Sequence, residues 1–268
     1  MSDFLERVVR ERRADAVRLR AERTGPALGK LRGRRSLRDA LAAQRRRGHL
    51  GVIAEVKRLS PAEGPLARSV DPAAQARIYS GAGAAVISVL TEPRHWGGSF
   101  DDLRAVRDAV AVPVLCKDVI VEAVQIDAAA EAGADAVLLI AEALNDAELA
   151  GLIQHARRRG LEALVEAHEA AAFGRAVRSG AQVVGVNARN LRDPREIDRS
   201  RARLLHTFAR PDQILVAESG IASAEDARAL PARVDAVLVG TALMRARDPG
   251  ALVRALATVT RQAPAEAR

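Results

Sequence analysis

The chain has 268 residues, of which 49% are apolar and 28% are charged. This composition supports a large buried core and argues against intrinsic disorder. No run of about 18 uncharged apolar residues is present, which excludes a membrane-spanning helix, and the charged N-terminal stretch does not fit a secretory signal peptide. The single cysteine, Cys116, excludes a disulfide framework and a cysteine-based zinc site. We therefore expect a cytoplasmic protein with no membrane partner.

Positive charge is concentrated at the start of the chain. The net charge is +8, and residues 1–50 alone carry 15 Lys and Arg against six Asp and Glu, a net of +9. Such an arm can indicate nucleic-acid binding. Aromatic residues make up only 2% of the chain, however, so stacking platforms for single-stranded nucleic acid are missing. We expect no nucleic-acid partner.

Two helices are predicted in this arm, over residues 4–21 and 36–43, separated by Gly and Pro signals. The arm is too rich in arginine to form a core alone. We expect its apolar side chains to pack on the rest of the protein while its arginines, including those at 45–47, turn to water. The apolar contacts are predicted at Phe4, Leu5, Val8, Val9, Leu28 and Leu31.

Eight short apolar runs follow, separated by helical stretches rich in Ala, Arg and Glu. The runs are 51–56, 85–90, 112–116, 136–140, 161–165, 182–186, 214–217 and 236–239. Continuous apolar runs are typical of parallel strands buried on both faces. Eight strand–helix units predict an α/β protein, a TIM (β/α)8 barrel over residues 51–268 with residues 1–50 as a helical extension. An open doubly wound sheet is the alternative, but no Gly-x-Gly-x-x-Gly follows the first run.

Lysine is rare in this chain and therefore informative. Only Lys30, Lys57 and Lys117 occur among 42 basic residues. An ammonium group can give up a proton, whereas a guanidinium group stays protonated. Because Lys57 and Lys117 end apolar runs, we expect both to serve a chemical role.

Polar residues gather at the ends of the predicted strands, where TIM barrels place their active sites. Besides the two lysines, the ends carry Glu55, Glu166, Asn187, Arg189, Glu218 and Ser219. Glu55 and Lys57 share side-chain parity, so both point into the barrel mouth. They could form one structural ion pair, but two carboxylates and two lysines exceed that need. Glycines after the last two strands predict a phosphate site at Gly220, Gly240 and Thr241.

Six motifs in chain order resemble those of the indole-3-glycerol phosphate synthase family of tryptophan biosynthesis. They are Ile53-Ala-Glu-Val-Lys-Arg-Leu-Ser-Pro61, Ser88-Val-Leu-Thr-Glu92, Pro113-Val-Leu-Cys-Lys-Asp-Val119, Leu164-Val-Glu-Ala-His168, Gly185-Val-Asn-Ala-Arg-Asn-Leu191 and Glu218-Ser-Gly-Ile221. The resemblance implies a carboxy-lyase that converts 1-(2-carboxyphenylamino)-1-deoxyribulose 5-phosphate to indole-3-glycerol phosphate, carbon dioxide and water. It implies no metal and no organic cofactor, and we expect a monomer or weak homodimer.

The resemblance also implies residue roles. Lys117 would protonate the carbonyl oxygen of the opened sugar, Lys57 would pair with the substrate carboxylate, and Glu166 would act as the base. Glu55 and Asn187 would position the ring-closing centre, with Ser219 nearby. The implied substrate contacts are Ser60, Gly220, Gly240 and Thr241 at the phosphate, and Arg189, Glu218 and Trp96 elsewhere.

Four positions depart from the family pattern: Leu59, Glu63, Val119 and Ala188. The family often has an aromatic residue at the position of Val119 and a cation at that of Glu63. The departures leave open a slower enzyme or a paralogue in a specialised indole pathway. Two further alternatives are a different phosphorylated sugar derivative as substrate and an inactive barrel that displays a basic binding arm.

Overall fold

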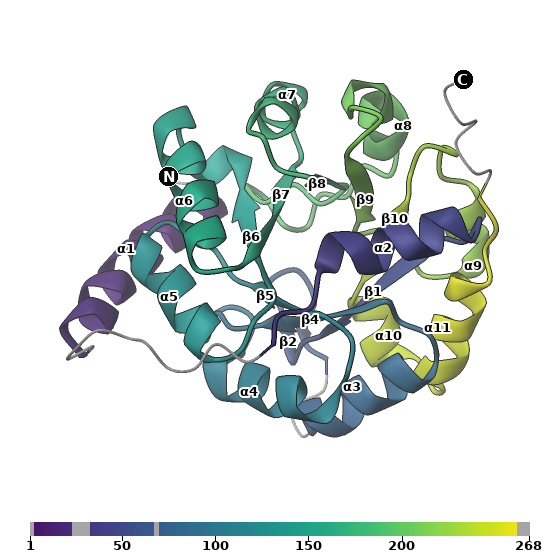
Figure 1. The fold of residues 1–268 in the computed structure, drawn as a ribbon, viewed down its shortest axis with the longest axis horizontal. Coiled ribbons are helices and arrows are strands. Elements are labelled where there is room, and N and C mark those ends of the chain that lie inside the picture. The colour runs from purple at the N-terminus through teal and green to yellow at the C-terminus, as the bar shows by residue number, and fades with distance from the viewer. Residues whose placement is uncertain (1–2, 23–32, 67–69, 262–268) are drawn as a thin grey trace.

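A closed barrel of eight parallel strands forms the body of the protein (Figure 1). The computed structural model describes residues 3–22, 33–66 and 70–261. The strands close in the order β1-β10-β9-β8-β7-β6-β5-β4. Their bounds are β1 (Gly51–Val56), β4 (Val86–Leu90), β5 (Val114–Lys117), β6 (Ala136–Ile140), β7 (Glu162–Ala167), β8 (Val183–Asn187), β9 (Ile214–Glu218) and β10 (Ala236–Val239). The predicted TIM barrel is confirmed, and each predicted run lies within two residues of its strand at both ends.

Helices surround the barrel between successive strands. They are α3 (Pro72–Gly81), α4 (Phe100–Ala109), α5 (Ala123–Glu131), α6 (Asp146–Arg158), α7 (Ala170–Arg178), α8 (Arg201–Leu205), α9 (Ala224–Arg228), α10 (Thr241–Arg245) and α11 (Pro249–Ala257), with the 3-10 turns η1 (Ala141–Ala143) and η2 (His206–Phe208). Short polar side chains fix several starts by accepting a backbone N–H of the first turn. These caps are Asp71, Ser99, Asn145, Ser223 and Asp248. None of the helices described is both long enough and apolar enough to span a bilayer.

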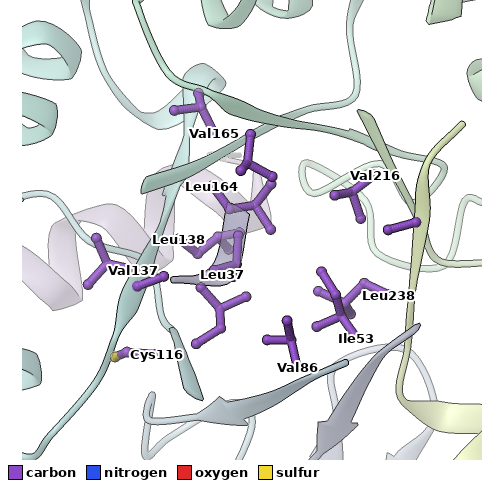
Figure 2. Close-up of a cluster of buried hydrophobic side chains, with 14 of the residues drawn as sticks. Leu37, Ile53, Val86, Cys116, Val137, Leu138, Leu164, Val165, Val216 and Leu238 are labelled. Carbon is purple, nitrogen blue, oxygen red and sulfur yellow. The ribbon is translucent and has the colours of Figure 1, made fainter. Parts of the chain in front are cut away.

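The barrel interior is filled by apolar side chains that converge from the strands. Figure 2 shows Ile53, Leu164, Val216 and Leu238 directed toward the centre. Ile53, Leu164 and Val216 each lie two residues before a glutamate of the mouth (Glu55, Glu166 and Glu218), so the apolar filling and the polar mouth share one face of these strands. The packed centre closes the barrel from below and confines solvent to its mouth.

The two helices of the extension lie at opposite ends of the barrel. Helix α2 (Leu37–Arg46) crosses the N-terminal end, where Leu37 and Leu41 are buried and Leu41 packs against Gly51 (Figure 1). Helix α1 (Phe4–Glu22) contacts segments that follow strands, among them η1 and α5. Both predicted helices are therefore confirmed, and one of them packs at each end of the barrel.

The predicted packing of the arm holds in part. Leu5 and Val8 are buried, and Phe4 and Val9 are half-buried against the core, while Leu28 and Leu31 lie outside the described residues. The prediction that the arm's arginines all turn to water is wrong. Arg12 is 5% exposed because Asp118 binds it, and that pair is described below.

Further exceptions lie at the other end of the barrel, where Arg34, Arg35 and Arg45 are half-buried. Arg45 is the clearest of these. Its Nε lies 3.4 Å from Asp235 Oδ1, so the side chain is half-buried against the barrel. Arg46 and Arg47 are exposed, as expected. Arg45 differs from its two neighbours because the buried carboxylate of Asp235 lies beneath α2 at this position.

A small hairpin after β1 was not predicted. Its antiparallel strands are β2 (Leu59–Ser60) and β3 (Gly64–Pro65). Leu59 N donates to Trp96 O at 3.2 Å, and Arg58 pairs with Asp102. Two-residue strands leave no periodic signal in a sequence, so this element becomes visible only in the structure.

Candidate active site

A cavity of about 590 Å³ opens at the C-terminal ends of the barrel strands. Residues from β1, β5, β8, β9 and β10 and the loops after them line it. The lining includes the predicted residues Glu55, Lys57, Ser60, Trp96, Lys117, Asn187, Arg189, Glu218, Ser219, Gly220, Gly240 and Thr241. Glu166 lies beside them and within reach of Lys117. Barrel closure therefore brings every predicted site residue to one place.

Lys117 stands at the centre of three carboxylates. Its Nζ lies 3.7 Å from Glu166 Oε2 and 3.9 Å from both Glu55 Oε2 and Glu218 Oε2. Each of these distances is longer than an ordinary hydrogen bond. The ammonium group is therefore held by charge from several sides, and its protons stay available to a ligand.

Lys57 forms the tight ion pair of the site. Its Nζ lies 3.0 Å from Glu55 Oε1. The pair packs against Gly240, where an added Cβ would lie 2.1 Å from Glu55 Oε1 and 3.1 Å from Lys57 Nζ. Any side chain at Gly240 would displace the pair, so this glycine also shapes the ionic cluster.

In the ionic cluster of Lys57, Lys117, Glu55, Glu166 and Glu218, neighbouring charges counteract the effect of burial on pKa values. Burial disfavours the charge of Lys117, but Glu166, Glu55 and Glu218 outweigh it and raise the pKa of the ammonium. Burial would likewise raise the pKa of Glu55, but Lys57 and Lys117 lower it below its ordinary value. At neutral pH Lys117 therefore holds its proton and Glu55 is ionised.

Glu218 behaves differently from the other carboxylates. Burial and the nearby Glu166 raise its pKa well above the ordinary value, and Lys117 only partly opposes them. Among the residues described, neither Glu218 oxygen accepts from an N–H or hydroxyl donor, and the group lies against Glu166. Its Oε1 also fills the space over Gly185, where a Cβ would approach to 2.2 Å. A proton on Glu218 removes one of the three negative charges that surround Lys117.

Asn187 links the cluster to the loop after β8. Its Nδ2 donates to Glu166 Oε2 at 3.4 Å, and its Oδ1 accepts from Arg189 N at 2.9 Å. His168 lies behind it, with Nδ1 2.8 Å from the backbone oxygen of Asn187. This places His168 in a supporting hydrogen bond and leaves the amide of Asn187 facing the carboxylates.

A sharp turn follows β9 at the predicted phosphate residues. Ser219 has a φ of 66° and Gly220 a φ of 74°, and a positive φ is uncommon for a residue with a side chain. Gly220, Gly240 and Thr241 line the same cavity as Ser60, which approaches from the hairpin. The backbone groups that follow β9 and β10 and the hydroxyl of Ser60 therefore lie around the same cavity.

An apolar slot adjoins the cluster on the side covered by α1. Its lining combines Lys117 and Glu166 with Phe4, Leu5, Val8, Leu90, Trp96, Asp118, Val119, Leu138, Ile140 and Leu191. The rings of Phe4 and Trp96 meet edge to face at 5.9 Å. The slot has a volume of only about 20 Å³, so a flat apolar group would enter it only if the lining side chains moved, and it would then lie against Lys117 and Glu166.

Comparison with known proteins gives the family. The sequence profile of the family "Indole-3-glycerol phosphate synthase" matches residues 5–256. The chain belongs to the indole-3-glycerol phosphate synthase family. It is 46% identical over 258 residues to indole-3-glycerol phosphate synthase 2 of Streptomyces coelicolor, covering 96% of this chain and 99% of the relative. It is 51% identical over 209 residues to the synthase of a Nocardioides species, covering 78% and 80%.

A solved structure gives the fold independently. Thiamine phosphate pyrophosphorylase from Pyrococcus furiosus superposes with a TM-score of 0.59 at 19% identity, covering 82% of this chain and 96% of that one. At this identity the likeness concerns the barrel alone. The family relation therefore supplies the activity, and it confirms the carboxy-lyase of tryptophan biosynthesis that the six motifs indicated.

Several residues of this family member's mouth were not predicted as site residues. Phe4 was predicted only to pack on the barrel. No role was predicted for Arg245, although it lies one helical turn after Thr241. Glu63 was noted for its charge, and the structure pairs it with Arg245 at 2.7 Å. Spacing after a predicted strand end could have pointed to Arg245. Phe4 comes from a helix remote in sequence and gave no such signal.

The described residues include no group of three or more His, Cys, Asp or Glu side chains arranged to hold a metal ion. The three carboxylates of the cluster surround an ammonium group instead.

Proposed function

We propose that the mouth cavity carries out the family reaction on 1-(2-carboxyphenylamino)-1-deoxyribulose 5-phosphate, with Lys117 as the general acid. The position of Lys117 supports this proposal most directly. Its ammonium lies within 4 Å of three carboxylates, between an apolar slot and a polar cavity. A substrate with an aromatic ring at one end and a phosphate at the other would place its central carbonyl beside Lys117.

Ring closure needs an acid at the carbonyl oxygen. The aromatic carbon that bears the carboxylate attacks the carbonyl carbon, and the oxygen gains negative charge as the new carbon–carbon bond forms. Lys117 holds its proton until that charge develops, because the surrounding carboxylates raise its pKa. The growing basicity of the oxygen then draws the proton across.

Decarboxylation and dehydration follow at neighbouring atoms. Loss of carbon dioxide returns the electron pair of the broken bond to the ring and restores its aromaticity. The hydroxyl then leaves as water, which requires a proton from an acid and removal of a proton from the adjacent carbon by a base. Lys57 pairs with the carboxylate beforehand and supplies the later proton, while Glu166 accepts one. Glu55 and Asn187 hold these two groups in place.

The remaining contacts orient the substrate. Ser60, Gly220, Gly240 and Thr241 would receive the phosphate, and Arg189 would assist in holding an anionic group. Trp96 and Val119 would contact the ring in the apolar slot. Valine leaves more room there than an aromatic residue would, so we expect weaker ring stacking. Glu218, protonated, would offer a neutral polar wall beside Glu166.

Residues 1–50 would serve this site as an extension of the barrel. Phe4, Leu5 and Val8 form one wall of the slot. Asp118, next to Lys117, receives two bonds from Arg12, at 2.9 Å from Nε and 2.8 Å from Nη2. The same Arg12 also binds Asp15. We therefore assign α1 to closure of the ring end of the site.

Product formation tests the proposal. Purified protein incubated with the carboxyphenylamino substrate should develop indole fluorescence, and a Lys117→Met variant of equal stability should not. A folded wild-type protein that yields no indole product would contradict the proposal. Turnover of a phosphorylated ribulose derivative without the aryl carboxylate would instead favour the other sugar substrate.

A further inference from the structure

The hairpin after β1 places a carboxylate inside the mouth cavity. Glu63 Oε2 lies 2.7 Å from Arg245 Nη1, and Glu63 Oε1 lies 3.8 Å from Arg189 Nη2. All three residues line the 590 Å³ cavity. The two arginines come from different strand ends, after β8 and β10, so Glu63 bridges the cavity between them.

The hairpin is anchored at its base and reaches the cavity at its turn. Leu66 N donates to Arg58 O at 2.8 Å, and Arg58 Nη2 donates to Asp102 Oδ1 at 2.8 Å. The turn carries Glu63, whose backbone N–H donates to Ser60 O at 3.2 Å. The side chain of Glu63 is 26% exposed. Its contacts with the arginines therefore form inside a fixed loop and need no movement of the barrel.

Positive charge dominates this side of the cavity. Arg189, Arg199 and Arg245 line it, and Lys57 lies beyond them. The lining carboxylates Glu55 and Glu218 lie near Lys117, and Glu55 forms its ion pair with Lys57. Burial lowers the pKa of Arg189, and Glu63 and Glu55 oppose that effect. Glu63 thus supplies negative charge where an anionic ligand would otherwise supply it.

We propose that Glu63 is an internal counter-anion that lowers the affinity of the cavity for anionic ligands. This inference rests on the proposed function. A phosphate or carboxylate that enters must displace Glu63 from Arg189 and Arg245 or accept its repulsion. Either event makes the free energy of anion binding less favourable. A small free anion has no other contacts to offset that loss, whereas a ligand that also fills the apolar slot does. Free anions are therefore held weakly, whereas a ligand that joins an anion to a ring gains its affinity from contacts that Glu63 does not affect.

A neutral isostere tests this role. Glu63→Gln keeps the size of the side chain and removes its charge. We expect inorganic phosphate, titrated calorimetrically, to bind about three- to tenfold more tightly, as expected for loss of one partly exposed competing ion pair. The KM for the substrate should fall by a similar factor, and kcat should stay unchanged because Glu63 contacts none of the groups assigned to the chemistry.

Asp193→Asn is the matched control. Asp193 pairs with Arg195 at 2.8 Å on the nearby surface and lies outside the cavity lining. This change removes the same charge, so it reproduces any general electrostatic effect. Phosphate affinity should change by less than about twofold. An equal gain in both variants would overturn the proposal, since net charge alone would then explain it.

A double variant tests whether Glu63 competes with phosphate for Arg245. In an Arg245→Gln background, Glu63→Gln should yield a smaller gain in phosphate affinity, because one of the released partners is gone. Unchanged or weaker phosphate binding by Glu63→Gln, with or without a lower melting temperature, would overturn the inference. The phosphate titration needs no turnover. A wild-type protein without activity would contradict the proposed function and leave this result standing.

Discussion

The two ends of the barrel both bury carboxylates under a helix of the extension, yet they bond the carboxylate oxygens differently. At the N-terminal end, Asp135 is fully buried and fully bonded. It accepts from Arg107 Nη1 at 2.7 Å, from Val114 N at 2.9 Å and from Arg35 N at 2.9 Å. Gln213 at the same end donates to two backbone carbonyls.

The C-terminal end leaves polar atoms without such partners. Glu166 Oε1 and both oxygens of Glu218 are buried and, within the described parts of the chain, accept from no N–H or hydroxyl donor. The ammonium of Lys117 lies 3.9 Å from Glu218 Oε2 and 3.7 Å from the other oxygen of Glu166, Oε2. Incomplete bonding is costly in a buried place.

The difference shows which buried groups of this fold contribute to stability and which are available for function. A saturated buried network fixes one arrangement and has nothing left to offer a ligand. An unsaturated network costs stability and keeps donors and acceptors ready for a substrate. Four predictions test this contrast, beginning with the largest expected effect.

Lys117→Arg should lower kcat/KM by about 10²- to 10⁴-fold, nearly as much as Lys117→Ala. Guanidinium keeps its proton and needs more room among the three carboxylates. Steady-state fluorescence of the indole product measures the loss, and circular dichroism confirms the fold. Turnover near the wild-type rate in the arginine variant would remove Lys117 from the role of proton donor.

Asp135→Asn should act on stability instead. It leaves Arg107 buried without its counter-charge, which costs about 3–5 kcal/mol and lowers the melting temperature by roughly 10 °C for a chain of this size. The kcat measured at 25 °C should stay close to that of the wild type. A large fall in kcat with little change in melting temperature would show that the two ends are not separate in function.

Glu218→Gln should change the pH dependence of stability. The pKa of Glu218 in the folded protein is raised above 4.5 by burial and by Glu166, so the unfolded chain loses this proton at lower pH. Stability therefore falls as the pH rises from 4.5 toward the folded pKa, by up to about 1.4 kcal/mol per pH unit. Glutamine cannot titrate and removes that slope.

Melting temperatures between about pH 5 and pH 8 test this change. For each pH unit between 4.5 and the folded pKa of Glu218, the wild type should lose about 2–4 °C more than Glu218→Gln. Asp118 and Glu142, whose pKa values burial also raises, titrate in both proteins and cancel in the comparison. Parallel curves for the two proteins would mean that Glu218 is ionised in the folded state.

Arg45→Gln and Arg46→Gln give the smallest effects and separate paired from solvated arginines. Arg45 supports Asp235, which also accepts from Arg233 at 2.6 Å and from Leu215 N at 2.8 Å. Its loss should cost about 1 kcal/mol, and that of Arg46 about 0.5 kcal/mol or less. Chemical denaturation measures the free energy of unfolding of each variant. Equal losses in the two variants would show that the contact of Arg45 with Asp235 adds nothing to stability.

Local patterns in the sequence determined the barrel and most of its mouth. Continuous apolar runs such as 51–56 and 236–239 are a property of neighbouring residues, so they specify buried parallel strands without knowledge of the partners. Alternation along a strand fixed the shared side of Glu55 and Lys57. The convergence of strand ends in a closed barrel then placed Lys117, Glu166 and Asn187 together.

Tertiary structure alone decided which charges meet. Arg12 and Asp118 lie 106 positions apart, and no periodicity links them, so this arginine was assigned to water although it is buried. Glu63 reaches Arg245 only because the first and last strands of the barrel are neighbours. Gly240 admits Glu55 for the same reason. Pairing energy depends on distance and burial, and barrel closure sets both for residues that the chain keeps far apart.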